Sequence, residues 1–516
     1  MSRIARVMCG ALYGVDAFRV DLEVAFSRTG MPAFTMVGLA EGAVKEARDR
    51  VFAALRSSSF RLPPARITVN LAPADRKKGG SSYDLPLAIG LLCAADLLPP
   101  EAVQAAEGYF FAGELSLTGE VRPVPGVLPL AILARSLGVK GFITAPENAG
   151  EAAIVEGLAV YPARSLGEAV GFIAGQCHIE PATPPVGTTY AEELGEFAPD
   201  FADVKGQEHA KRAIEIAAAG GHNLLLLGPP GSGKTMLARR MPSILPQLDF
   251  EEALEVTKVY SVCGLLPAGQ GLMQERPFRS PHHTISEYGL AGGGAYPKPG
   301  EISLAHRGVL FLDELLEFKK NTLEVLRQPL EEGVVTISRS AMSLTYPANV
   351  MLVSAMNPCP CGYATDPKRR CTCTDMDIQR YRAHLSGPLL DRIDLHVEVP
   401  SVAFEDLRSV TPGKSSAAMR ETVERTRAVQ RKRYAGTPFS CNAGLSGKAL
   451  EHHCALDEAA HNFLRQAVTS LHLSARAYTR ILRIARTVAD MEASERISVV
   501  HLAEAVNCRV LDKENG

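Results

Sequence analysis

Residues 222–240 read HNLLLLGPPGSGKTMLARR, and this stretch decides the fold of the central part of the chain. Four consecutive leucines predict a buried strand, and the residues after Gly233 have the pattern of a helix. The loop between them fits G-x-x-x-x-G-K-[ST], in which glycines let backbone N–H groups converge on nucleotide phosphates beside a helix N-terminus. The stretch therefore predicts an α/β domain with a parallel sheet and a nucleotide site.

Two side chains of this loop have separate expected tasks. Lys234 is placed to reach the β- and γ-phosphates, and Thr235 to bind Mg²⁺. The alternative is a glycine-rich turn that binds nothing. The residues expected to bind the nucleotide are Gly228, Pro229, Pro230, Gly231, Ser232, Gly233, Lys234, Thr235 and, from the next strand, Asp313.

A second apolar strand, GVLFLDEL (residues 308–315), ends in an acidic pair. The carboxyl ends of parallel strands are where α/β sheets bind ligands. Asp313 is therefore expected to hold Mg²⁺ through water, and Glu314 to orient and activate the attacking water. The alternative is a helix N-cap with a neighbouring acid.

A third strand and two arginines complete the candidate catalytic set. ANVMLVSAMN (residues 348–357) predicts a strand that ends at Asn357, within reach of the γ-phosphate or the attacking water. Arg392 precedes another predicted strand, and Arg476 lies in a helical stretch. An arginine from a neighbouring subunit can stabilise charge on the γ-phosphate. Each arginine can instead be a solvated charge or part of a structural ion pair.

These motifs, in this order, resemble the AAA+ ATPases. The stretches at 279–315 and 333–362 resemble the magnesium-chelatase-like branch and, within it, the bacterial ComM/YifB family. The resemblance implies that Asn357 is the sensor-1 residue, Arg392 the arginine finger and Arg476 the sensor-2 residue. It also implies a hexameric ring with ATP at the subunit interfaces. By resemblance, the activity is that of a DNA helicase that drives branch migration when incoming DNA recombines in naturally competent bacteria. The resemblance also makes recombination proteins candidate partners.

Several features are compatible with single-stranded or branched DNA as the substrate. VVTISRSAMSLTY (residues 334–346) predicts a β-hairpin with Arg339 near its tip, where it can grip a phosphate. Residues 280–301 have the glycine and proline content of an inserted loop, so His282 and His283 are interpreted as loop residues rather than metal ligands. The basic run at 424–436 is equally well explained as a solvated helix face. The hairpin arginine can likewise be simply solvated.

Residues 357–373, NPCPCGYATDPKRRCTC, hold four of the eleven cysteines. Two C-x-C pairs in a reducing compartment predict a structural Zn²⁺ site, although their spacing is tighter than usual. Reduced thiols and disulfides remain the alternatives. The basic residues between the pairs are candidates for facing DNA or the next subunit. The ligands are Cys359, Cys361, Cys371 and Cys373, and the basic residues are Lys368, Arg369 and Arg370.

Four segments are predicted along the chain. Residues 1–180 mix strands and helices and resemble the Lon proteolytic domain, residues 181–200 form a linker, residues 201–400 the AAA+ core, and residues 401–512 a helical lid. The Lon-like nucleophile would fall at Ser82, but the position of its lysine base is occupied by Leu128, which cannot accept a proton. We therefore expect no peptidase activity, and Ser82 is interpreted as a loop serine.

Bulk properties narrow the class of protein. The formal net charge of −2 excludes a globally basic nucleic-acid binder but not a local basic groove. No apolar run reaches the roughly 18 residues of a membrane span, and the start predicts a strand rather than a signal peptide, so a cytoplasmic protein is expected. The competing hypotheses are an ATPase subunit of a metal chelatase, which by resemblance lacks the Lon-like block, and an ATP-dependent protease, against which Leu128 argues.

Overall fold

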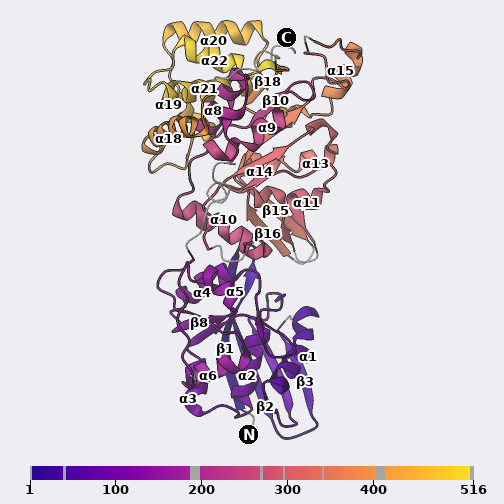
Figure 1. Ribbon diagram of the computed structural model, residues 1–516, viewed down its shortest axis with the longest axis vertical. Coiled ribbons are helices and arrows are strands. Elements are labelled where there is room, and N and C mark those ends of the chain that lie inside the picture. Colours follow the sequence, from indigo (N-terminus) through magenta and orange to yellow (C-terminus); the bar gives the residue numbers. More distant parts are fainter. Residues whose placement is uncertain are drawn as a thin grey trace. The chain divides into compact units, whose positions relative to one another are not determined.

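The computed structural model describes residues 3–38, 42–185, 198–267, 271–294, 297–339, 342–366, 368–402 and 413–511 (Figure 1). The chain forms two compact units. The first comprises residues 1–189, 250–274 and 295–298, and the second comprises residues 190–249, 275–294 and 299–516. Most of the predicted linker, residues 186–197, lies outside the described residues. None of the described helices is long and apolar enough to cross a membrane.

A seven-stranded sheet forms the centre of the first unit, in the order β3-β4-β2-β1-β5-β8-β9. β2 pairs antiparallel with β1 and β4, and the other neighbours are parallel. The predicted first strand is confirmed. The strands are β1 (Arg3–Tyr13), β2 (Asp16–Ser27), β3 (Ala33–Val37), β4 (Arg66–Ala72), β5 (Tyr109–Phe111), β8 (Gly141–Thr144) and β9 (Val160–Pro162).

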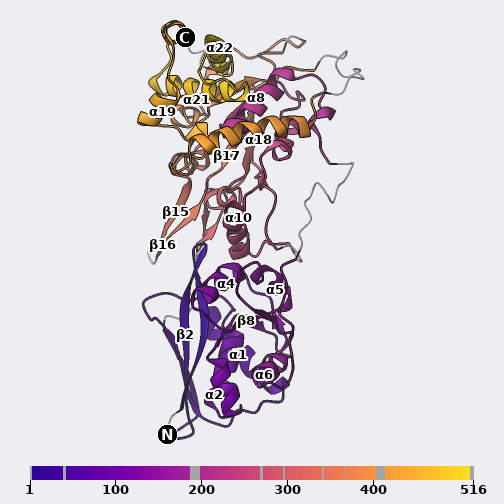
Figure 2. The same cartoon turned by 90° about the vertical axis from the view of Figure 1, so that its left-hand side faces the viewer.

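Helices pack on this sheet because they carry too many apolar side chains to remain exposed to water. Every residue of α2 (Asp84–Ala94) is buried, and this helix packs on β1 and β2 (Figure 2). After β5 the chain forms a separate two-stranded ribbon of β6 (Glu114–Leu115) and β7 (Val121–Arg122). The other helices are α1 (Gly42–Ser57), α3 (Pro100–Ala106), α4 (Val127–Ser136), α5 (Pro146–Ala152) and α6 (Leu166–Ile173).

One segment of the predicted AAA+ core belongs to the first unit. Helix α10 (Phe250–Cys263) lies there, and the Ser261 hydroxyl donates to the buried Glu151 carboxylate. Glu151 also accepts from the Leu128 N–H at 2.9 Å, and burial raises the pKa of its carboxyl group. Leu128, at the position where the resemblance to Lon would require a lysine, is fully buried. Helix α10, although it lies within the predicted core at 201–400, therefore packs on α4 in the first unit.

The second unit contains a five-stranded parallel sheet in the order β11-β14-β17-β10-β18. The predicted apolar strands are all present, and every residue of the three central ones is buried, as expected for a sheet covered on both faces. The strands are β10 (Leu224–Leu227), β11 (Phe278–Arg279), β14 (Val309–Leu312), β17 (Met351–Met356) and β18 (Leu395–Glu398).

Helix α8 (Glu208–Gly220) precedes β10, helix α9 (Lys234–Arg239) follows the phosphate loop, and a helical group follows the sheet in the chain (Figure 1). Residues 451–470, whose period is helical throughout, contain part of α19 and all of α20, because the Asp457 carboxylate caps a new helix start by accepting from the Ala460 N–H. The C-terminal helices are α18 (Ser416–Arg433), α19 (Gly447–His453), α20 (Glu458–Ser470), α21 (Ala475–Met491) and α22 (Val499–Asn507).

The insertion between the phosphate loop and β14 carries more structure than the sequence predicts. It contains α11 (Glu287–Ala291), a ribbon of β12 (Gly292–Gly293) and β13 (Lys298–Pro299), and α12 (Glu301–Leu304). The predicted hairpin is present as β15 (Val334–Arg339) and β16 (Met342–Pro347). Its turn, residues 340–341, lies outside the described residues. The connecting helices are α13 (Lys320–Glu324), α14 (Arg327–Glu332), α15 (Asp375–Arg382) and α16 (Gly387–Leu390).

Candidate nucleotide site and cysteine cluster

Three strand ends meet at one edge of the second sheet. β10, β14 and β17 run parallel, so the residues that follow them lie at the same carboxyl edge. Thr235 Oγ1 donates to Asp313 Oδ2 at 2.6 Å, and Lys234 Nζ lies 3.3 Å from Asn357 Oδ1. The structure thus brings together the phosphate loop, the acidic strand end and the strand-end asparagine.

The glycines of the loop are required by its geometry. A side chain at Gly228 would overlap the carbonyl oxygen of Val399, so only glycine allows this close approach. Gly233 has φ +93°, which L side chains rarely adopt, immediately before α9 begins at Lys234. These two positions turn the chain sharply enough to present backbone N–H groups at the helix N-terminus.

Lys234 is buried beneath the loop, where its ammonium group donates to the carbonyl oxygens of Gly228 at 2.7 Å and Pro229 at 2.9 Å. Desolvation lowers the pKa of Lys234 to about 8, although the carboxylates of Asp313 and Glu314 act in the opposite direction. A bound triphosphate would add negative charge beside the ammonium group. Nucleotide binding is therefore expected to raise this pKa.

This linkage predicts a pH dependence for ATP affinity. Below about pH 8 Lys234 is already protonated in the free protein, so the affinity for ATP should not change with pH. Above about pH 8, ATP binding must be accompanied by uptake of a proton, and the affinity should weaken by up to about tenfold per pH unit. Lys234→Arg is the control, because a guanidinium stays protonated and removes the slope. ATP titrations across this range measure it. An unchanged slope in Lys234→Arg assigns the titration to another group.

The residues present fit a magnesium nucleotide. Thr235 and Asp313 present two oxygen atoms side by side, which are the ligands that Mg²⁺ prefers. Ser232 Oγ is buried in the loop and has no hydrogen-bond partner within the described parts of the chain. Both features suit the phosphate and cation of a bound nucleotide, whose Mg²⁺ would supply charge neutralisation at the β- and γ-oxygens.

Glu314 is exposed at the edge of this site, in a left-handed backbone conformation with φ +52°. His283 Nδ1 lies 3.4 Å from Glu314 Oε2, and the His283 ring also contacts the rings of His282 and Phe318. The sequence prediction assigned no catalytic task to either histidine. Only the position of the insertion relative to β14 reveals that His283 contacts the candidate base.

The structure does not bring the two candidate arginines to this edge. Arg392 precedes β18, its carbonyl accepts from Asn223 Nδ2 just before β10, and Leu224 pairs with Leu395. Both arginines therefore lie at the amino edge of the sheet, about 13 Å away for a four-residue strand. Arg392 forms an ion pair with Glu331, and Arg476 pairs with the adjacent Asp391 at 2.6 Å.

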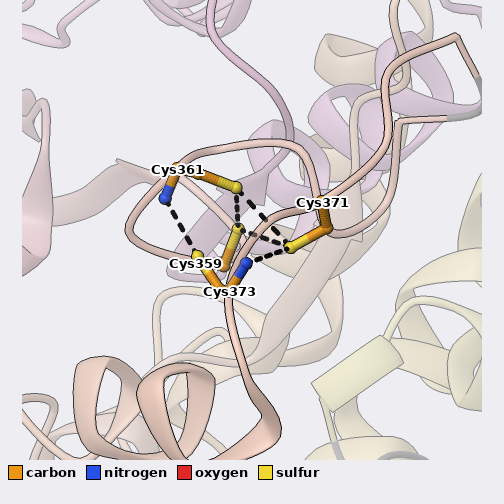
Figure 3. Close-up of side chains that lie close together, drawn as sticks. All are labelled: Cys359, Cys361, Cys371 and Cys373. Carbon is orange, nitrogen blue, oxygen red and sulfur yellow. Dashed lines mark hydrogen bonds between the residues drawn. The ribbon is translucent and has the colours of Figure 1, made fainter.

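The four cysteines predicted as metal ligands converge in one cluster (Figure 3). Their sulfur atoms all lie within 4.8 Å of one another, and none is in a disulfide. The Sγ distances are 3.3 Å for Cys359–Cys361, 3.7 Å for Cys359–Cys371 and 3.5 Å for Cys361–Cys371. A tetrahedral Zn²⁺ with bonds of about 2.3 Å separates its sulfur ligands by about 3.8 Å, so the cluster is compatible with zinc.

Backbone hydrogen bonds favour the thiolate form of Cys361, whereas at Cys371 and Cys373 they are outweighed by desolvation and the neighbouring thiols, which raise the pKa. The N–H of Cys361 points to Cys373 Sγ, and the N–H of Cys373 points to Cys371 Sγ, each at 3.4 Å. Hydrogen bonds from the backbone of Thr372 and Tyr363 lower the pKa of the Cys361 thiol to about 5. A thiolate is the form that binds a metal.

The candidate DNA-binding residues are exposed. Arg339 lies over the ring of Tyr288 in α11 at 4.9 Å, which joins the hairpin to the insertion. Lys368 donates to the carbonyl of Val402, and Arg369 stacks on Tyr363. Arg370 is exposed in the same loop. Ser82 is half-buried, and its carbonyl accepts from the Gly113 N–H.

Comparisons with known proteins assign the family. Residues 200–407 match the family model described as "Magnesium chelatase, subunit ChlI", residues 413–509 its C-terminal model, and residues 22–148 the model "Subunit ChlI of Mg-chelatase". The chain is 46% identical to the competence protein ComM of Haemophilus influenzae, over 98% of each protein. The chain belongs to the ComM/YifB family. It is also 43% identical to the YifB protein of Salmonella typhimurium, over 99% of this chain and 98% of that protein.

Family membership identifies the parallel sheet and the phosphate loop of the second unit as parts of an AAA+ domain. The second unit carries a magnesium-chelatase-type AAA+ domain with a helical C-terminal region, and this family implies an ATPase that uses ATP and Mg²⁺. The magnesium-chelatase 38 kDa subunit of Rhodobacter capsulatus is 23% identical over 31% of this chain and 50% of that subunit. Likeness to the chelatase subunits is therefore partial, whereas likeness to ComM extends over the whole chain.

Proposed function

We propose that the protein is an ATP-driven ring motor in which each nucleotide site is completed by a neighbouring copy of the chain. The observation that carries this proposal is the separation of Arg392 and Arg476 from the phosphate loop, across the length of the sheet. For either of these arginines to stabilise charge on a γ-phosphate, it would have to act on the nucleotide of another subunit. A ring of identical subunits, six by resemblance, places every pair of arginines at a neighbour's nucleotide.

We propose that this motor acts on single-stranded or branched DNA. A relative that matches over 98% of the chain, ComM of Haemophilus influenzae, is named as a competence protein, and this name supports the proposal. Arg339 and Tyr288 together offer a cation for phosphates and a ring for base stacking. The proposed activity is a helicase that promotes branch migration while incoming DNA recombines during natural transformation. The protein would work in the cytoplasm, with recombination proteins as partners.

We propose further that Cys359, Cys361, Cys371 and Cys373 bind one Zn²⁺ ion. The alternative function, an ATPase subunit of a metal chelatase, is less well supported. A family model named for a magnesium-chelatase subunit also matches residues 22–148, so the presence of this N-terminal region does not decide between the two functions. The share of the chain that each relative matches does favour the DNA motor, because the two chelatase subunits each match only 31% of the chain.

A branch-migration assay on a synthetic junction, with ATP and Mg²⁺, tests the proposed function. We expect DNA to stimulate ATP hydrolysis. We also expect the junction to be separated into its duplex products by branch migration only when ATP is present. Arg339→Ala is expected to weaken DNA binding and to lower its salt dependence by about one phosphate contact, because it removes one cation. Arg327→Ala, in an exposed ion pair with Glu324, is the matched control. If forked or single-stranded DNA neither stimulates hydrolysis nor is unwound, the DNA motor is refuted.

A further inference from the structure

The cysteine loop, residues 357–374, contacts the phosphate loop directly. Gly362 has φ +85°, and a Cβ atom there would lie 2.6 Å from Pro230 Cδ. The Gly228 N–H donates to the Met356 carbonyl at 3.2 Å, just before the cysteine loop begins. The phosphate loop is therefore supported on one side by the loop that holds the four thiols.

Regular secondary structure does not hold the cysteine loop in place. Among its described residues, none lies in a helix or a strand before α15 begins at Asp375. Side-chain hydrogen bonds join it to its surroundings from Arg382 Nε to the Pro358 carbonyl, from Lys368 Nζ to the Val402 carbonyl and from Ser401 Oγ to Asp366 Oδ1. The cysteine cluster joins the two ends of the loop, because Cys359 and Cys361 lie near its start and Cys371 and Cys373 near its end. A metal ion there would be the strongest cross-link in the segment.

We infer that Zn²⁺ bound by the four cysteines shapes the nucleotide site, so that zinc occupancy sets the affinity for ATP. The ion would hold Gly362 against Pro230 and keep Asn357 beside Lys234, since both residues lie within three positions of a zinc ligand. Losing the ion would free this side of the phosphate loop while leaving the sheet intact. The inference rests on the proposed zinc and nucleotide sites but not on any action on DNA.

Zinc content and nucleotide affinity of the full-length protein test the inference. We expect about one zinc per chain, and at least about tenfold weaker binding of a fluorescent ATP analogue after chelation, which adding Zn²⁺, but not Mg²⁺, reverses. Cys373→Ser should reproduce the loss, and Cys177→Ser, an exposed cysteine of the first unit, should not. Folded protein that contains no zinc, or zinc-free folded protein with unchanged ATP affinity, overturns the inference.

Gly362→Ala decides the outcome if the zinc-free protein does not fold. This variant keeps all four cysteines but forces a Cβ toward Pro230. We expect normal zinc content and weakened ATP binding, whereas unchanged ATP affinity with zinc present would contradict the inference. No DNA enters these measurements. A protein whose hydrolysis is not stimulated by DNA, but which binds ATP only with zinc, therefore refutes the DNA motor and supports the inference. A protein that acts on DNA, but binds ATP equally well without zinc, supports the DNA motor and refutes the inference.

Discussion

Glu314→Gln is expected to bind ATP normally and to hydrolyse it about 10²–10⁴-fold more slowly than the wild type, because an amide cannot accept the proton of the attacking water. The substitution changes a side chain that is exposed at the carboxyl edge of the sheet, so folding should be unaffected. Since ATP would remain bound at the interfaces, the variant should also accumulate as a stable ring. Steady-state hydrolysis, ATP titration and size analysis measure the three effects.

The matched control is Glu317→Gln, three residues along the chain in the short helical turn after the acidic pair. It removes one exposed carboxylate from the same region but not from the strand end. We expect wild-type turnover from it. Normal turnover in Glu314→Gln would show that another group activates the water, and His283, 3.4 Å from the carboxylate, would then be the first neighbour to examine.

Arg392→Ala is expected to lower hydrolysis by about 10³–10⁵-fold, the usual contribution of an arginine that reaches the γ-phosphate from a neighbouring subunit. Because Arg392 lies at the amino edge, its loss should leave ATP binding in its own subunit intact. Lys234→Ala should instead prevent ATP binding while leaving Arg392 available. Hydrolysis by each variant alone should therefore be negligible.

Mixing the two variants tests the interface directly. A hybrid ring contains interfaces where the phosphate loop of an Arg392→Ala subunit meets the intact arginine of a Lys234→Ala subunit, and activity should reappear there. Arg465→Ala, an exposed arginine of α20, is the control and should hydrolyse ATP normally. No recovery at any mixing ratio would count against delivery of Arg392 in trans. Arg476→Ala, mixed in the same way, tests whether both arginines act from the same subunit.

The sequence predicted the strands around the nucleotide site because their signal is local. Each is a short run of apolar residues, and the structure buries every residue of β10, β14 and β17. The convergence of Lys234, Asp313 and Asn357 also followed from sequence, since parallel strands end at the same edge of a sheet. The four cysteines, predicted from sequence to form one site, converge in the loop between β17 and α15.

Other predictions differed from the structure where a local pattern competes with packing or capping. Residues 451–470 have a helical period throughout, but Asp457 caps a second helix within them. Helix α10 follows the phosphate loop in sequence but belongs to the first unit, where Leu254 and Leu272 pack against the buried core. Periodicity predicts that a helix has an apolar face and not which surface covers that face.

Sequence alone determined the class of this protein: a phosphate loop, an acidic strand end and a strand-end asparagine in the order of an AAA+ ATPase, with four cysteines after the last of them. Only the tertiary structure decided that Arg392 and Arg476 lie at the far edge of the sheet, that His283 meets Glu314 and that Gly362 supports Pro230. The motifs are encoded by adjacent residues, whereas these contacts depend on the order of strands in the sheet and the path of the loops, which bring together residues far apart in the chain.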